Sequence, residues 1–133
     1  MKLSTLGNTP SKEFNFLDPY TNQPTDIYIT VKPLKSKAGK EIEHNMRLKI
    51  AELMQDEKNI IKTDKRVDLN PDIMMDITIS MVAELVEDWR GIQDDDDKDI
   101  VYSKEIALEL LREHQSIADA IYLFSSNLGN FQK

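Results

Sequence analysis

Apolar residues recur at intervals of three and four over three long stretches of the chain, and this spacing predicts three helical regions. The first runs from about Lys40 to Gln55, the second from Pro71 to Trp89 or Arg90, and the third from Ser103 to Leu128. Within the third stretch the pattern weakens at His114-Gln115-Ser116, where the chain can break into two helices.

The second predicted helix has the clearest ends. Asn70 is a preferred N-cap residue, Pro71 suits the first helical position, and Asp72 faces the positive end of the helix dipole. Gly91 is expected to end this helix, because glycine is common just after a helix C-terminus. Ser103 is expected to cap the third region.

Two short runs near the N-terminus favour strands. Residues 13–17 and 27–31 partly alternate between apolar and polar side chains, and the segment between them is rich in turn-forming residues. This arrangement predicts a hairpin with a long loop, whose second strand ends before Pro33. Residues 56–70 are mostly polar and are expected to form a loop or a short broken helix.

These patterns predict a mainly α fold: a small helical domain of three to five helices with an N-terminal β hairpin. Residues 1–133 are expected to form a single domain, with a hairpin-like segment over 1–34 and the helical part over 35–133.

The apolar face of the second predicted helix is unusually wide. Most of its apolar residues span an arc of roughly 200°, whereas a helix on the surface of its own domain needs about 100°. Either this helix is central in the core or part of its face meets a partner. Methionines fill irregular gaps and also suit adaptable binding surfaces. Five of the six methionines lie on the first two predicted helices: Met46, Met54, Met74, Met75 and Met81.

Composition is that of a soluble globular protein, with 40% hydrophobic and 31% charged residues. No apolar run approaches the roughly 18 residues of a membrane span, and the N-terminus does not read as a secretory signal. Cysteine is absent, which excludes disulfides and thiolate chemistry and fits a cytoplasmic protein.

The net charge of −7 is unevenly distributed. Residues 32–66 carry 10 basic and 6 acidic side chains, whereas residues 67–133 carry 5 basic and 15 acidic ones. The plain interpretation is solvated helix faces. The alternative is head-to-tail self-association, with the basic middle of one copy meeting the acidic end of the next.

No constellation of catalytic residues is recognisable. The two histidines, His44 and His114, lie on separate predicted elements, and their spacing gives no indication of a metal site. The four glycines are scattered, so there is no phosphate-binding loop. An acidic chain also disfavours nucleic-acid binding, because it repels phosphate. We therefore expect no enzyme activity, cofactor, metal, nucleic acid or membrane partner.

The acidic run at residues 94–97 resembles the start of a calcium-binding EF-hand loop. Asp94, Asp96 and Glu105 would take positions 1, 3 and 12. However, Lys98 and Asp99 stand where that loop needs an oxygen ligand and a glycine. A solvated acidic turn is the interpretation that the sequence favours.

The C-terminal part of the chain resembles the tail assembly chaperones of long-tailed bacteriophages. The resemblance covers residues 71–131 well and residues 1–70 in outline. Asp97 departs from the family pattern, in which the turn often has a glycine. The residues that carry the resemblance are Trp89-x-Gly91, an acidic turn with Lys98, Ile100-x-Tyr102-Ser103-x-Glu105, Ala107-x-x-Leu110-Leu111, Ile117-x-x-x-Ile121 and Asn127-x-x-Asn130-Phe131.

This resemblance implies a non-enzymatic assembly factor that acts in the host cytoplasm and is absent from the mature virion. Such proteins bind and solubilise the tape measure protein and help to recruit the tail tube protein. The expected partner-binding residues are Met74, Met75, Met81, Trp89 and Phe131. Trp89 is also expected to anchor the core. An alternative function is that of a small acidic regulator that mimics the charge of a nucleic acid.

Overall fold

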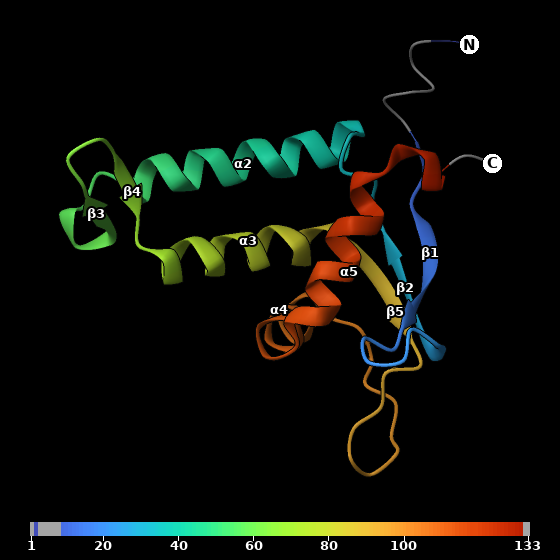
Figure 1. Ribbon diagram of the computed structural model, residues 1–133. Coiled ribbons are helices and arrows are strands. Elements are labelled where there is room, and N and C mark those ends of the chain that lie inside the picture. Colours follow the sequence, from blue (N-terminus) through green and yellow to red (C-terminus); the bar gives the residue numbers. More distant parts are fainter. Residues whose placement is uncertain (1, 3–8, 132–133) are drawn as a thin grey trace.

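The computed structural model describes residues 2 and 9–131 and shows a three-stranded antiparallel sheet beside a group of helices, with a helical arm extending away from the sheet (Figure 1). Residues 1, 3–8 and 132–133 of the predicted domain lie outside the described part. The elements in chain order are β1 (Lys12–Leu17), β2 (Pro24–Val31), α2 (Lys37–Leu53), a 3-10 turn η1 (Glu57–Asn59), β3 (Ile60–Lys62), β4 (Val67–Leu69), α3 (Pro71–Leu85), β5 (Val86–Arg90), α4 (Lys104–Glu113), α5 (Gln115–Ser126) and a second 3-10 turn η2 (Leu128–Phe131).

The main sheet has the strand order β1-β2-β5, with both neighbouring pairs antiparallel. The β1–β2 hairpin confirms the N-terminal hairpin that the sequence predicts. Arg90 on β5 links all three strands. Its guanidinium carbon lies 3.9 Å from the ring centroid of Tyr28 on β2, and its Nη2 atom lies 3.0 Å from Oε1 of Glu13 on β1.

The third strand, β5, is where the predicted fold class is wrong. Sequence periodicity extends the second helix to Trp89 or Arg90, but α3 ends at Leu85 and the next five residues form a strand. Val86 and Trp89 fit a helix face and also suit a strand, so periodicity alone cannot separate the two. The free edge of β2 decides the outcome: Ile29 pairs with Trp89, and the Lys32 amide donates to the Leu85 carbonyl at 2.8 Å.

A second correction concerns residues 56–70, for which a loop or broken helix was expected. They form η1 and then a β3–β4 hairpin, in which Ile60 pairs with Leu69. The Thr63 amide closes the turn by donating to the Arg66 carbonyl at 2.9 Å. With two sheets distributed along the chain, the fold is mixed α and β rather than mainly α with one N-terminal hairpin.

The predicted starts of the second and third helical regions are confirmed. The Asn70 side chain accepts a hydrogen bond from the Asp72 amide, with Pro71 in the first turn, and the Ser103 side chain accepts from the Ile106 amide. The break expected near His114 is also present, since α4 and α5 meet there. The first predicted helix begins three residues earlier than expected, at Lys37.

Gly91 has a role different from the one predicted. It follows a strand rather than a helix, and its φ of 85° lies in the left-handed region that favours glycine. A Cβ atom at this position would lie 1.8 Å from the Asp26 carbonyl oxygen. Gly91 therefore allows the chain to turn closely over the start of β2.

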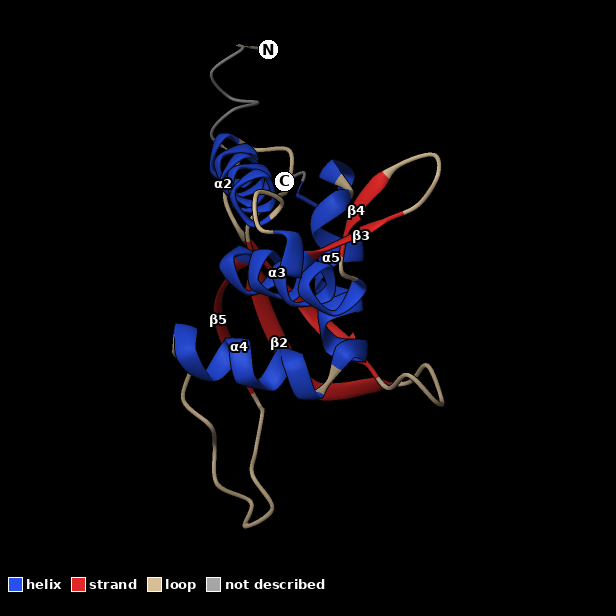
Figure 2. Cartoon of the chain, turned by 90° about the vertical axis from the view of Figure 1, so that its left-hand side faces the viewer, coloured by secondary structure: helices blue, strands red, loops and turns tan. Residues whose placement is uncertain are grey.

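The core lies between the main sheet and the helices, and α3 occupies the centre of the helical layer. Both views place α3 between α2 and α4 (Figures 1 and 2). The C-terminal half of α3 is packed from several sides, which explains the width of its apolar face. Its buried residues are Ile77, Ile79, Met81, Val82, Ala83 and Leu85.

Candidate partner-binding groove

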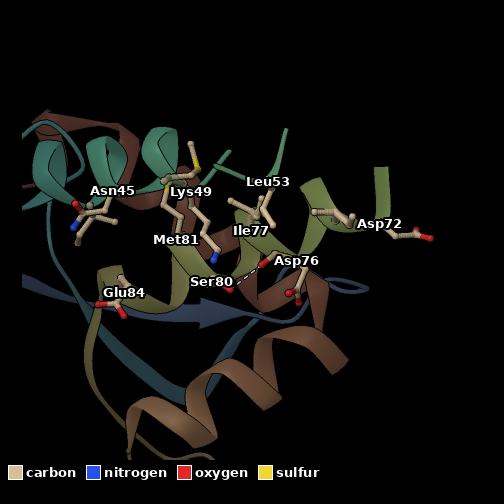
Figure 3. Close-up of a pocket in the computed structure, with 12 residues that line it drawn as sticks. Asn45, Lys49, Leu53, Asp72, Asp76, Ile77, Ser80, Met81 and Glu84 are labelled. Carbon is tan, nitrogen blue, oxygen red and sulfur yellow. Dashed lines mark hydrogen bonds between the residues drawn. The ribbon is translucent and has the colours of Figure 1, made fainter. Parts of the chain in front are cut away.

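An apolar groove with a volume of about 750 Å³ runs between α2 and α3 on the arm (Figure 3). Both helices contribute residues at helical spacing along its length. Its lining residues are Ile42, Asn45, Met46, Lys49 and Leu53 on α2, and Asp72, Ile73, Asp76, Ile77, Ser80, Met81 and Glu84 on α3.

The groove exists because α2 is fixed at one end and is shallowly packed elsewhere. At the fixed end, a Cβ atom on Gly39 would lie 2.2 Å from the Leu34 carbonyl oxygen, so the helix backbone touches the preceding loop. The Ser36 hydroxyl donates to the Pro33 carbonyl at 2.7 Å and accepts from the Gly39 amide at 3.1 Å. Gly39 is the buried residue of α2. The rest of the helix therefore leaves its apolar side chains incompletely covered.

The two walls of the groove differ in how far their apolar side chains are buried. Ile42, Met46 and Leu53 on α2 are half-buried, whereas Ile77 and Met81 on α3 are buried. An apolar side chain that remains partly in water loses part of the stabilisation that full burial gives, roughly 25 cal/mol per Å². Covering this groove with another apolar surface would recover that stabilisation.

The rim of the groove is mainly acidic. Asp72, Asp76 and Glu84 lie along the edge of α3 away from α2, while Lys49 extends from α2 toward α3 (Figure 3). Two of these carboxylates are paired with side chains from the α4 region, listed here with their distances: Asp76 Oδ1 with Arg112 Nε at 2.9 Å, and Glu84 Oε2 with Lys104 Nζ at 3.2 Å. Among the described residues, Asp72 forms no ion pair.

The residues predicted to bind a partner fall into three groups. Met74 and Met75, at the outer end of α3, are 36% and 45% exposed, so they are available to another molecule. Met81 is buried but lines the groove. Trp89 and Phe131 are in the hydrophobic core, and they contact solvent little in this conformation.

Sequence reasoning missed most of the α2 side of the groove. Its apolar residues keep helical spacing, which predicts a helix, and nothing in that spacing tells a filled core from an open groove. Leu48, another apolar residue of α2, is 56% exposed but does not line the groove, so it gives no signal for this site.

Comparison with models of known protein families identifies the family of this chain. A family model described as the YdaY prophage protein matches residues 35–133. The chain belongs to the YdaY prophage protein family. The chain is thus phage-derived, as the resemblance to phage proteins implies, and the match includes both helices of the groove. Searches of curated proteins and of solved structures found no match.

In this family member, the acidic turn predicted at residues 94–97 is held by hydrogen bonds within the turn, including bonds to the Asp94 side chain. Asp94 Oδ1 accepts hydrogen bonds from the amides of Asp96 at 2.9 Å and Lys98 at 3.1 Å, and the four aspartates are exposed. Asp97 has a φ of 60°, in the left-handed region where glycine is most easily accommodated. Over the part of the chain that the structure describes, no group of three or more ligating side chains could hold a metal ion.

None of the described helices is long and apolar enough to cross a membrane.

Proposed function

We propose that this prophage protein is a tail assembly chaperone that binds the tape measure protein, keeps it soluble and helps to recruit the tail tube protein. The observation that supports this proposal best is the incompletely covered apolar surface of the arm formed by α2, the β3–β4 hairpin and α3. It comprises the α2–α3 groove and the exposed Met74 and Met75. The phage origin of the family and the resemblance of residues 71–131 to tail assembly chaperones support the same proposal.

The arm suits a long helical partner for a physical reason. A long helix presents an apolar stripe that aggregates in water unless another apolar surface covers it. Methionine side chains are flexible and adapt to different apolar neighbours, so Met46, Met74, Met75 and Met81 can contact a varied stripe. Each arm covers only a short length of helix, and many copies would therefore act along one tape measure protein.

Under this proposal the protein performs no catalytic step. It acts in the host cytoplasm while the tail is assembled and is released before the virion is complete. The interactions are then apolar contact with the tape measure protein and surface contact with the tail tube protein.

Co-expression tests the proposal. The chain is produced with the tape measure protein of the same prophage, and the soluble complex is measured against an empty vector. Replacing Met74 and Met75 together by glutamine should reduce the soluble complex strongly, because it removes exposed apolar contacts. The matched control is Leu123→Gln on α5, an exposed apolar residue outside the arm, which should leave the yield unchanged. If the wild-type chain leaves its partner as insoluble as the empty vector does, the chaperone proposal is wrong.

A second candidate function rests on the acidic side chains of residues 67–133 and on the exposed turn Asp94–Asp97. These could mimic a nucleic acid and block a protein that binds one. Salt separates the two functions, because charge mimicry weakens steeply as ionic strength rises, whereas apolar helix contact persists.

A further inference from the structure

We infer that the α2–α3 groove binds one amphipathic helix of about three turns, whose apolar ridge is flanked by basic side chains. The inference rests on the proposed function and specifies which part of the partner enters which site. It follows from the length of the groove, the character of its walls and the charge on its rim.

The length of the groove fixes the length of its occupant. The lining residues of α2 extend from Ile42 to Leu53, and those of α3 extend from Asp72 to Glu84. At 1.5 Å per residue these spans are roughly 16–18 Å, the length of about three helical turns. A third helix lying along this groove would complete a three-helix arrangement with α2 and α3.

The walls fix the ridge that enters the groove. On α2 the lining residues Ile42, Met46 and Lys49 follow at intervals of four and three, so they form one face of the helix. Opposite them, Ile77 and Met81 form the apolar floor. A partner helix would insert apolar side chains spaced at i, i+3 or i+4, and i+7, the usual pattern of helix-in-groove recognition.

The rim fixes the charge of the occupant. Three carboxylates lie on the α3 side of the groove, whereas the one ammonium group of its lining, that of Lys49, lies on the α2 side and is 3.9 Å from Oε1 of Glu52. Since Arg112 and Lys104 already pair with Asp76 and Glu84, the carboxylate of Asp72 is the group most available to an incoming cation. The basic side chain of the partner is therefore expected near Asp72, where the groove reaches the outer end of the arm.

The first experiment uses two synthetic peptides of about 18 residues as probes, each with leucines at i, i+3, i+4 and i+7 spacing. One carries lysines on its flanks and the other carries glutamates at the same positions. Binding of the fluorescently labelled peptides is measured by anisotropy. We expect the lysine peptide to bind and the glutamate peptide to bind at least about tenfold more weakly at low salt. Equal binding of the two peptides would overturn the assigned charge preference.

Filling the groove tests the place of binding. Asn45 is an exposed residue that lines the groove, so Asn45→Trp should occupy the space and weaken the lysine peptide by about tenfold. The matched control is His44→Trp, an exposed neighbour on the same helix that does not line the groove, and it should bind as the wild type does. If both variants bind the peptide equally well, the groove is not the binding site.

Two charge variants distinguish a local effect on binding from a general loss of structure. Lys49→Gln should tighten binding of the lysine peptide and Asp72→Asn should weaken it, each by about two- to fivefold at low salt. A damaged fold would weaken both variants, whereas opposite shifts require an electrostatic effect at the rim. A second copy of this chain as the true occupant would appear as dimerisation that Asn45→Trp abolishes, and that result would overturn the inference.

The outcomes separate this inference from the proposed function. If the wild-type chain and Asn45→Trp both solubilise the tape measure protein in co-expression, the chaperone function stands and the groove assignment fails. If neither solubilises it but the peptide results hold, the groove binds basic amphipathic helices from a different partner.

Discussion

Replacing Trp89 by alanine is expected to lower the free energy of unfolding by about 3–5 kcal/mol. The indole ring is 8% exposed and packs within the core. Its Nε1 atom donates a hydrogen bond to the Ile100 carbonyl at 2.7 Å, and its ring meets that of Tyr102 edge to face with centroids 5.1 Å apart. A single residue thus connects β5 to the segment that leads into α4.

The magnitude can be divided among these contacts. The hydrogen bond accounts for about 1 kcal/mol and the aromatic pair for about 0.5–1.5 kcal/mol, with burial of the ring supplying most of the remainder. Trp89→Phe keeps an aromatic ring but leaves the Ile100 carbonyl without its donor. Its expected loss is about 1–3 kcal/mol, smaller than that of the alanine variant.

The assay is urea denaturation. Trp89 is the sole tryptophan of the chain, so its fluorescence follows unfolding of the wild type, whereas the variants must be followed by far-ultraviolet circular dichroism. The wild type and both variants should all be measured by circular dichroism so that the comparison uses one signal. A loss below about 1 kcal/mol for Trp89→Ala would refute the anchoring role, because that value is far below the usual cost of truncating a buried tryptophan.

Three further predictions concern the turn, the pH dependence and self-association. Gly91→Ala should lower the free energy of unfolding by at least about 2 kcal/mol, because it combines a left-handed backbone with a clash against the Asp26 carbonyl. The control Gly129→Ala should cost less, because its new Cβ atom approaches the flexible Asn127 side chain. Burial raises the pKa of the Tyr102 hydroxyl above its ordinary 10.0. The stability that the neutral hydroxyl contributes is therefore full below pH 10.0 and is lost as pH rises through the raised pKa. Urea midpoints measured at several alkaline pH values should fall less in Tyr102→Phe than in the wild type. Head-to-tail self-association should appear in sedimentation at low salt and disappear at high salt. The reason is that α2 and the acidic turn 94–97 project from opposite ends of the molecule (Figure 1). A strict monomer at high concentration and low salt would exclude this self-association.

Part of the candidate site could be predicted from the sequence, and part could not. The exposed methionines at the start of α3 were found because that helix has a wider apolar face than one core contact needs. The groove itself was missed because half-buried and fully buried positions share the same helical spacing. The position of α2 relative to α3 depends on the close contact at Gly39 and on the β3–β4 hairpin that joins the two helices. Neither feature changes the spacing of apolar residues within a helix, so that spacing could not reveal the groove.

The sequence alone determined the features that rest on contacts between near neighbours in the chain. The N-caps at Asn70 and Ser103 depend on side chains that bond to backbone amides two or three residues away, and the break near His114 coincides with a local weakening of the apolar spacing. The β1–β2 hairpin likewise follows from two alternating runs around one turn segment. Only the tertiary structure decided that the residues after Leu85 form a strand, because the open edge of β2, more than fifty residues earlier, supplies hydrogen bonds that a continued helix could not satisfy. The same distant pairing placed Trp89 in the core, while Met74 and Met75 at the outer end of α3 remain exposed.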